Sequence, residues 1–345
     1  MQLKNLPSVA IVILNWNGKQ FLEQFLPSVV NSSYGNKEVI VADNASTDDS
    51  ISFLENHYPE VRILRNEKND GFAGGYNWAM QHIDAEIAVL LNSDVEVTSG
   101  WIEPVVDLFN QNPSVAAVQP KILDYNKKDH FEYAGACGGW IDNYGYPFSR
   151  GRIFDTIEKD FHQYDDPMKI FWASGAAMFI RTSIFKEMGG FDPFFFAHQE
   201  EIDLCWRMQL SGYEIMSCPQ SVVYHIGGGT LAKENPKKVF LNFRNNLIML
   251  YKNLSFLELI KLIPIRLFLD FVSAIKSCLS GHFSYYVAIG KAHFAFFGWL
   301  LFQQSKSIFP SKTSGQTHGR YNGNIAWEHF INGKKRFSEI ISVEN

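Results

Sequence analysis

An apolar run that ends in an acid is the feature of this sequence best suited to binding a ligand. Residues 87–91 are apolar and are followed at once by Asn92, Ser93 and Asp94. Buried strands of open α/β sheets deliver ligand-binding groups at their carboxyl ends. Oxygen ligands at this spacing suit a hard cation such as Mg²⁺ or Mn²⁺. The phosphates of a substrate usually complete the coordination shell of such a cation. Because all three residue types also form turns, they could instead simply end the strand.

Three further polar clusters stand where strands are predicted to end. They are Asn15-Trp16-Asn17-Gly18, Asp43-Asn44 and the glycine-rich run 69–77. Amide and backbone groups of the first cluster could hold a nucleobase, and Asp43 could accept the imide N–H of uracil or thymine. Glycines such as Gly71 and Gly74 let the backbone approach a ligand closely. Each cluster alone could equally be a polar turn or a helix start.

Three carboxylates stand within four residues at a predicted helix start, at Glu200, Glu201 and Asp203. Adjacent like charges repel, so the pKa of one of these acids can rise towards that of a useful general base. The helix dipole also favours acids at this position, which is the structural alternative. His225 ends an apolar run; a lone histidine is more often structural, but beside a carboxylate site it can bind a metal or phosphate.

Strands and helices alternate along the first 118 residues. Short apolar runs predict strands at 9–14, 38–42, 61–64, 87–91 and 115–118, with helical spacing of apolar residues between most of them. Further strands are predicted at 172–180, 214–217 and 222–225, and a helix at 200–210, whereas 120–170 has no clear pattern. The alternation predicts an α/β fold with a mainly parallel sheet and helices on both faces.

Composition divides the chain near residue 236. The net charge of −5 hides a split of roughly −14 for residues 1–230 and roughly +9 for residues 231–345. We therefore expect one part at 1–236 and a second at 237–345. Residues 254–302 are dense in aromatic and aliphatic side chains, but no charge-free stretch exceeds about 14 residues, short of the ~20 that span a bilayer. Basic amphipathic helices lying on an anionic membrane are expected, and a helical subdomain packed on protein is the alternative.

Several classes are disfavoured by what the sequence lacks. Neither G-x-G-x-x-G after the first strand nor G-x-x-x-x-G-K-[ST] occurs, so a glycine-rich phosphate cradle is not expected. The four cysteines have no paired spacing, which disfavours a disulfide framework or zinc site and favours a reducing, cytosolic compartment. Nucleic acid is not expected as a partner.

Taken in chain order, these clusters resemble glycosyltransferase family 2, whose GT-A fold is a Rossmann-like, mainly parallel sheet. The matching pieces are Asn15-Trp16-Asn17-Gly18, Asp43-Asn44-Ala45-Ser46, the run 69–77, Asn92-Ser93-Asp94, Ser174-Gly175-Ala176, Gly189-Gly190-Phe191-Asp192, the run 200–207, and His225 with Gly227 and Gly228. They cover roughly residues 8–230. Within the family the chain is most similar to bacterial rhamnosyltransferase-type enzymes of cell-surface polysaccharide synthesis.

The resemblance implies a role for each cluster. It assigns the nucleotide and its diphosphate to Asn15, Asn17, Asp43, Asn69, Gly71, Phe72, Gly74, Asn77, Asn92 and Ser93. It implies that Asp94 and His225 hold Mg²⁺ or Mn²⁺. It makes Glu201 the catalytic base, with Asp203 and then Glu200 as the other candidates, and it places Trp172 and Gly175 near the acceptor.

Two residues depart from the family pattern. The metal motif is often Asp-x-Asp, but its first position here is the neutral Asn92, which predicts weaker metal binding. The base is usually the Asp of a Glu-Asp pair, but here it is Glu201, one methylene longer.

The resulting prediction is an inverting glycosyltransferase that moves a sugar from a dTDP- or UDP-sugar to a hydroxyl of a glycan or lipid-linked acceptor. Residues 1–236 would be its catalytic domain, and residues 237–345 its membrane-associating region. The protein is expected in the cytoplasm, peripheral on the inner face of the cell membrane; a homo-oligomer is left open. The alternatives are a non-catalytic carbohydrate- or membrane-binding scaffold and, less suited to the loop at Asn15, a sugar-nucleotide pyrophosphorylase.

Overall fold

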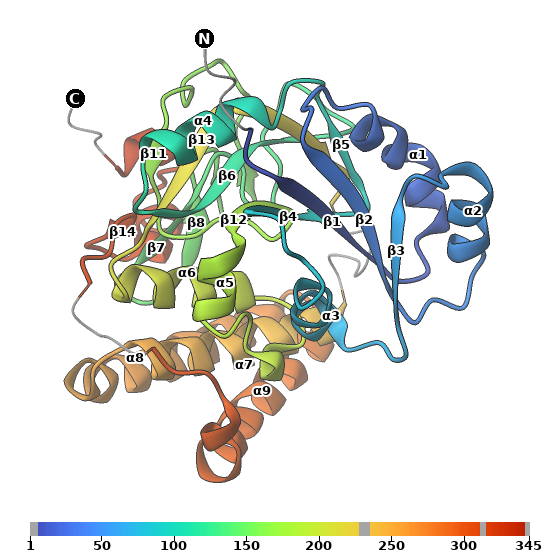
Figure 1. Ribbon diagram of the computed structural model, residues 1–345. Helices are drawn as coiled ribbons and strands as arrows, with labels where there is room; N and C mark the ends of the chain where they lie inside the picture. The colour runs from blue at the N-terminus through green and yellow to red at the C-terminus, as the bar shows by residue number, and fades with distance from the viewer. Residues whose placement is uncertain (1–5, 228–234, 311–314, 342–345) are drawn as a thin grey trace.

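The main sheet of the molecule has a parallel half that ends in the predicted polar clusters. The computed structural model describes residues 6–227, 235–310 and 315–341. In these residues a nine-stranded sheet runs in the order β11-β13-β6-β12-β4-β1-β2-β3, and β5 pairs with β13 (Figure 1). The strands are β1 (Val9–Asn15), β2 (Lys37–Asn44), β3 (Arg62–Asn66), β4 (Ile87–Asn92), β5 (Val95–Val97), β6 (Val115–Asp124), β11 (Met168–Lys169), β12 (Ala177–Arg181) and β13 (Glu214–His225).

Strand directions confirm the predicted fold class. The neighbours β3, β2, β1 and β4 are parallel, as are β6 and β13, whereas β12 is antiparallel between β4 and β6. The apolar runs of β1 and β4 are buried on both faces, as expected when helices cover both sides of a parallel sheet. The chain therefore has a mixed α/β fold with a large, mostly parallel sheet.

Two helical layers cover this sheet. One face carries α1 (Lys19–Val30), α2 (Ser50–His57) and α4 (Glu103–Gln111), whose apolar side chains share a core with β1, β2 and β4. The other face carries α3 (Gly71–Met80), α5 (Thr182–Glu187) and α6 (Glu200–Leu210). Helix α6 coincides with the helix predicted at 200–210.

The segment 120–170 forms most of a second, five-stranded sheet. Its order is β10 (Thr156–Ile157), β9 (Arg152–Ile153), β8 (Pro147–Ser149), β7 (Gly139–Asp142) and β14 (Arg320–Tyr321). Strand β14 comes from the far end of the chain, and Ile325 and Phe337 are buried in the same small core. The end of the basic region thus folds back onto the acidic part.

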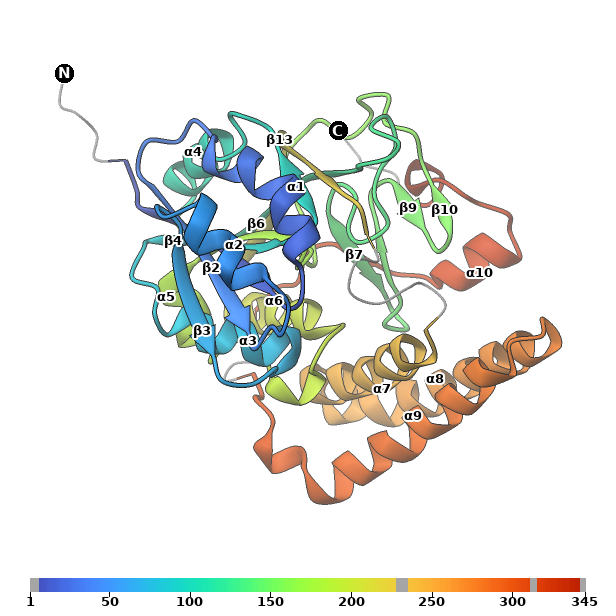
Figure 2. The same ribbon diagram turned by 90° about the vertical axis from the view of Figure 1, so that its right-hand side faces the viewer.

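Helices make up most of the rest of the C-terminal region. They are α7 (Pro236–Asn253), α8 (Phe256–Leu279), α9 (Phe283–Phe302) and α10 (Ile325–Phe330), with the short 3₁₀ turns η2 (Gln304–Lys306) and η3 (Phe337–Glu339); a further 3₁₀ turn, η1 (Pro193–Phe195), precedes α6. Figures 1 and 2 show α7, α8 and α9 as one layer on the side of α3 and α6. Leu247 and Leu250 of α7 share the core of α6, so residue 236 is not a boundary in packing. Within the described residues, no helix is both long and apolar enough to cross a bilayer.

Two strand predictions differ from the structure. The strand predicted at 172–180 begins only at Ala177, because the backbone of Ser174 bonds instead to the Gln119 side chain (N to Oε1, 2.8 Å). The strands predicted at 214–217 and 222–225 are one strand, β13, with a register irregularity between Cys218 and Val222.

Candidate functional site

The predicted clusters of the first 94 residues meet at one edge of the main sheet. Asn15 at the end of β1 lies opposite Asp43 of β2, and Leu14 lies opposite Asn92 of β4. Because these strands are parallel, their carboxyl ends share an edge, which is where open α/β sheets bind ligands.

Asn15 and Asp43 form a buried polar pair at this edge. Asn15 Nδ2 donates to Asp43 Oδ1 and to Ser46 Oγ, each at 3.1 Å. Asp43 Oδ2 accepts the Ser46 N–H at 3.0 Å. Asn17 Oδ1 accepts the backbone N–H of Thr47 at 2.6 Å and thereby ties the loop after β1 to the loop after β2. Each Asp43 oxygen has a second lone pair, so the carboxylate can still accept from a ligand.

The glycine-rich run begins α3 against the loop that precedes α6. Gly71 has a positive φ of 71°, and a Cβ there would lie 2.7 Å from the Phe196 carbonyl oxygen. The backbone N–H of Phe72 donates to that same carbonyl at 2.8 Å. Asn69 Oδ1 accepts from Gly71 N at 2.9 Å. Only glycine therefore allows this contact between the two loops.

Other residues predicted to bind the nucleotide make contacts within the protein. Asn77 exchanges two hydrogen bonds with the backbone of Phe191, at 2.7 and 2.8 Å, so its amide holds that loop to α3. Gly74 packs on Asp70, whose Cβ would be 2.7 Å from an added Cβ. Ser93 lies by the first loop, where a Cβ on Gly18 would be 3.6 Å from its Oγ.

Asp94 and His225 are brought together by the pairing of β5 with β13. His225 lies opposite Val95, and its Nε2 is 3.1 Å from Asp94 Oδ1. The amide Nδ2 of Asn92 is 3.5 Å from the same nitrogen. On the far side of the ring, Nδ1 lies 3.3 Å from Glu132 Oε2. Glu132 belongs to the segment without a sequence pattern, and no signal in the sequence identifies it.

This donor set fits a divalent cation. A carboxylate, an imidazole and an amide that can turn its oxygen inward are ligands of Mg²⁺ and Mn²⁺, and a carboxylate behind a ligating histidine is the usual support for such a ring. Burial lowers the pKa of His225, but the charges of Glu132 and Asp94 outweigh burial and raise this pKa to about 10. The negative charges of Glu132 and Asp94 therefore stabilise a positive charge at this position.

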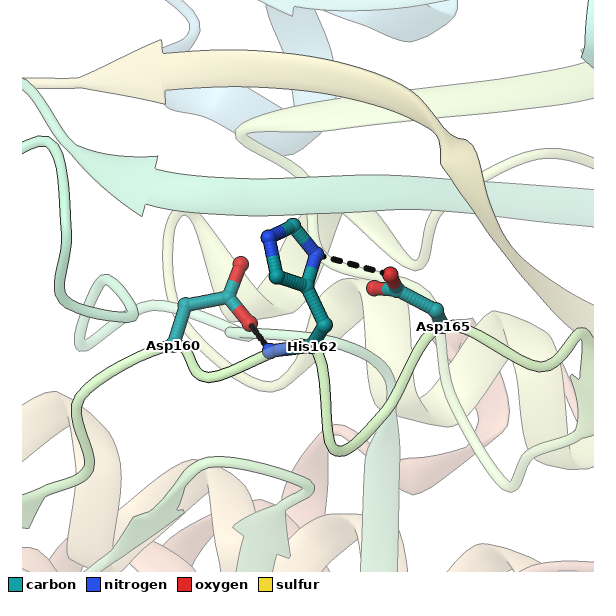
Figure 3. Close-up of side chains that lie close together, drawn as sticks. All are labelled: Asp160, His162 and Asp165. Atoms are coloured by element: carbon teal, nitrogen blue, oxygen red, sulfur yellow. Dashed lines mark hydrogen bonds and ion pairs between the residues drawn. The ribbon is translucent and has the colours of Figure 1, made fainter.

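A second cluster of potential metal ligands lies elsewhere, and its carboxylates are already paired with a lysine. Asp160, His162 and Asp165 come close together in the described part of the chain (Figure 3). Both carboxylates pair with the Lys121 ammonium, which is 2.9 Å from Asp160 Oδ2. The loop is outside the predicted site, so this cluster does not supply its metal ligands.

Glu201 lies at the start of α6, after a loop with unusual backbone angles. Phe196, His198 and Gln199 all have positive φ values, 64°, 70° and 74°. This conformation costs free energy for residues other than glycine, and packing must hold it in place. It places Glu200 in the interior and leaves Glu201 partly exposed.

The two glutamates differ in what they can do. Burial, and then the charge of Glu201, raise the pKa of Glu200 well above its usual range. Burial raises the pKa of Glu201 to about 7, against backbone hydrogen bonds that lower it. A partly exposed residue whose carboxyl has a pKa near neutral pH suits a general base, because such a group can take up a proton under working conditions.

Asp203 has a structural role, which corrects its place among the candidate bases. Its Oδ2 is 2.9 Å from both Arg207 Nε and Lys252 Nζ, and its Oδ1 accepts from Asn253 Nδ2 at 2.9 Å. The side chain is fully buried. Burial raises the pKa of Asp203, but Lys252 and Arg207 outweigh burial and hold this pKa below its usual value. Asp203 anchors α6 to α7 and is not available to a substrate.

Helix α7 also holds the loop before Glu201, a feature that sequence reasoning missed. Asn245 Nδ2 lies within 2.7–3.0 Å of the carbonyl oxygens of Phe195, Ala197 and His198. Asn246 Nδ2 donates to Gln199 Oε1 at 3.3 Å. The C-terminal region therefore fixes the position of the candidate base.

Trp172 and Gly175 shape the wall beside these loops. The buried Trp172 ring lies on Gly139, where a Cβ would be 2.1 Å from ring atoms, and its Nε1 donates to Trp140 O at 3.0 Å. Gly175 packs against the Phe72 ring, 2.9 Å from an added Cβ. Gly228, the last residue of the predicted His225 motif, lies outside the described residues.

The chain is similar in sequence to known sugar-transferring proteins. The N-acetylglucosaminyl-diphospho-decaprenol L-rhamnosyltransferase of Mycobacterium tuberculosis strain H37Rv is 27% identical over 233 residues, which are 62% of this chain and 75% of that protein. A low-salt glycan biosynthesis hexosyltransferase of Haloferax volcanii is 22% identical over 254 residues, 72% of this chain and 77% of that protein.

Solved glycosyltransferase structures share the fold. A structure of GalNAc-T7 with UDP, GalNAc and Mn²⁺ has a TM-score of 0.57 at 16% identity, covering 72% of this chain and 48% of that one. A mannosyltransferase of Pyrobaculum calidifontis with GDP-Man and Mn²⁺ has a TM-score of 0.51 at 14% identity, covering 87% and 76%. The model of the family named Glycosyl transferase family 2 matches residues 8–189. The chain therefore belongs to glycosyl transferase family 2 and is a glycosyltransferase.

Proposed function

We propose that this enzyme is an inverting glycosyltransferase of cell-surface polysaccharide synthesis, with a dTDP- or UDP-sugar donor and a hydroxyl of a glycan or lipid-linked acceptor. The observation that carries the proposal is a set of three acids, one at the end of the parallel strand β2, one just after the parallel strand β4 and one at the start of α6. Asp43 is a buried acceptor, Asp94 is paired with His225, and Glu201 has a pKa of about 7. Base recognition, diphosphate binding and proton removal need three such groups in different environments.

Asp43 supports a donor with an imide N–H. Asn15 holds the carboxylate in place by its 3.1 Å hydrogen bond, and burial makes an unmatched partner costly. Uracil and thymine both present an N–H to such an acceptor, whereas adenine has no ring N–H in a nucleotide.

Asp94 and His225, with the oxygen of Asn92, would hold Mg²⁺ or Mn²⁺, and Glu132 would orient the imidazole from behind. Bound there, the cation would neutralise charge on the departing diphosphate. Asn92 contributes no charge, so the cation would be held less tightly than by an Asp-x-Asp pair.

Glu201 would act on the acceptor. Its carboxylate takes the proton of the acceptor hydroxyl while that oxygen forms a bond to the anomeric carbon of the sugar. The bond from the anomeric carbon to the diphosphate oxygen breaks on the opposite face, and the configuration at this carbon inverts. Positioning of the two substrates supplies much of the rate.

A calorimetric titration tests the donor assignment. UDP and dTDP are titrated, each with and without Mn²⁺, into wild type and into Asp94→Ala. We expect binding that Mn²⁺ strengthens in wild type and that loses this dependence in Asp94→Ala. The nucleotide that binds more tightly identifies the base of the sugar donor. Failure of both nucleotides to bind would refute the donor assignment, and binding without turnover of any sugar nucleotide would favour the scaffold alternative.

A further inference from the structure

Helix α8 buries an ion pair and exposes many large apolar side chains, which is unusual for a helix on a water-soluble protein. Two of its five charged residues, Arg266 and Asp270, are buried, at 2% and 0% exposure. Most of its large apolar side chains are exposed, among them Phe268 at 63% and Leu279 at 85%. A helix that faces water turns its apolar stripe to the core and its charges outward, so this arrangement needs an explanation.

Specific contacts hold the polar side of α8 inward. Arg266 Nη1 donates to the Tyr144 carbonyl at 2.8 Å, and its Nη2 lies 3.2 Å from Asp270 Oδ1. His293 Nε2 of α9 is 3.3 Å from Asp270 Oδ2. The guanidinium also lies 3.8 Å from the centre of the Tyr146 ring. These contacts fix the rotation of α8 about its axis, and the apolar side is outward as a result.

Helix α9 extends the same apolar surface. Phe294 and Phe302 are 83% and 79% exposed. Helices α8 and α9 pack against each other on the side of α7 away from the sheet (Figures 1 and 2). A groove of about 380 Å³ between them is lined mainly by apolar side chains, among them Phe271 and Phe294. We call the exposed surface of α8 and α9 the α8–α9 face.

The charges on the α8–α9 face are mostly positive. In α8, α9 and the turn after α9, the exposed charged residues are Lys261, Lys276, Lys291 and Lys306 against the single acid Glu258. A second copy of this face would bring lysines against lysines, whereas an anionic lipid surface would pair them with phosphates.

We propose that the α8–α9 face lies flat on the headgroup region of an anionic membrane. Apolar side chains such as Phe268 and Phe294 enter the boundary between headgroups and acyl chains, and the lysines contact lipid phosphates. The inference rests on the polarity of these helices and is independent of the sugar transfer proposed above.

Docking on this face would also orient the catalytic site. Helix α9 packs on α7, and Asn245 of α7 holds the loop before Glu201. The membrane-facing layer and the candidate base thus belong to one packed unit. A lipid-linked acceptor would then meet the enzyme in a constant orientation.

Vesicle co-sedimentation of the full chain tests the proposal. The vesicles are phosphatidylcholine alone, or phosphatidylcholine with 30% (about a third) phosphatidylglycerol, an anionic surface of the kind these lysines would attract. We expect binding to the anionic vesicles. We expect at least tenfold weaker binding for Phe268→Gln/Phe294→Gln, because two aromatic side chains no longer enter the lipid. Each Lys→Gln change at Lys261, Lys276 or Lys291 should weaken binding by about fivefold.

Phe161→Gln is the matched control, because Phe161 is 71% exposed on a loop outside the α8–α9 face. It should bind like wild type. Circular dichroism and donor hydrolysis in solution report whether each variant is folded and active, so loss of lipid binding is distinguished from failure of the proposed transfer. No binding of wild type to anionic vesicles, or equal binding by the double variant, would overturn the proposal. So would an oligomer in solution that the double variant dissociates, because a second copy would then cover the face.

Discussion

Replacing Glu201 by glutamine should remove activity and at the same time stabilise the protein at alkaline pH. Burial raises the pKa of Glu201 to about 7 from an ordinary value of 4.5. Above pH 7 the folded protein must carry a carboxylate whose charge its surroundings disfavour. The neutral, isosteric glutamine lacks that charge, while it also cannot accept a proton from the acceptor.

The size of each effect follows from the structure. A shift of this size corresponds to roughly 3 kcal/mol, and because Glu201 is partly exposed we expect about 1–2 kcal/mol of it in the free energy of unfolding. The unfolded chain loses this proton near pH 4.5 and the folded protein near pH 7. Stability from this group is therefore lost as the pH rises between these values. Loss of a general base typically lowers the rate 10²–10⁴-fold.

Two assays test the prediction. Urea unfolding of wild type and Glu201→Gln at pH 8 should show the variant to be more stable, with a difference that shrinks towards pH 5. Single-turnover transfer should show a wild-type rate that rises with pH to a plateau above about pH 7. The rate of Glu201→Gln should not show this rise with pH. Calorimetry should show unchanged nucleotide binding.

Glu200→Gln is the matched control for this experiment. Burial, and then the charge of Glu201, raise the pKa of Glu200 well above its usual range, and Glu200→Gln removes this neighbouring carboxyl while leaving Glu201 in place. The rate of transfer by Glu200→Gln should still rise with pH to a plateau, as in wild type. A Glu201→Gln rate within tenfold of wild type, or a rise with pH that survives in it, would refute the assignment of Glu201 as the base. Equal loss of transfer and of nucleotide binding would do the same.

Three further predictions concern residues that support the site. Glu132→Gln should weaken Mn²⁺ binding 10–100-fold, because the carboxylate 3.3 Å from His225 Nδ1 no longer supports the ring; calorimetry with Mn²⁺ measures this, and unchanged affinity would remove Glu132 from the site. Asp203→Asn should lower the free energy of unfolding by about 3–5 kcal/mol, because it leaves Lys252 with one fewer buried counter-charge; a urea titration at pH 7 checks it, and a loss below 1 kcal/mol would contradict the anchoring role. Asn245→Ala should lower the rate of transfer with little change in the Michaelis constant of the donor, because three carbonyls of the loop before the base lose their partner; steady-state kinetics tests this, and a change in the donor constant alone would contradict it.

Local pattern in the sequence was enough to predict the parallel half of the sheet and the residues at its edge. Strands such as β1 and β4 are short apolar runs followed by polar residues, and a parallel sheet brings their carboxyl ends together. The positions of Asn15, Asp43 and Asn92 at one edge follow from that pattern. The segment 120–170 had no such pattern, because its two- to four-residue strands are too short to show a period.

The roles of neighbouring acids depended on tertiary contacts. Glu201 and Asp203 are two residues apart at the start of one helix, and their residue types alone do not separate a base from an anchor. Lys252 and Asn253, about fifty residues later, pair with Asp203, whereas no ion pair joins Glu201 to a cation within the described residues. Glu132 likewise joins the site only through its approach to His225.

In the C-terminal helices, too, some features follow from the local sequence and others from tertiary contacts. Sequence alone determined that residues 254–302 form apolar helices with a basic excess, because composition and spacing are local properties. Only the tertiary structure decided which side of α8 faces the protein, because that choice depends on Tyr144 and His293 meeting Arg266 and Asp270. Burial and charge pairing are set by residues distant in the chain, and these two quantities determine both the chemistry of the acids and the surface presented to solvent.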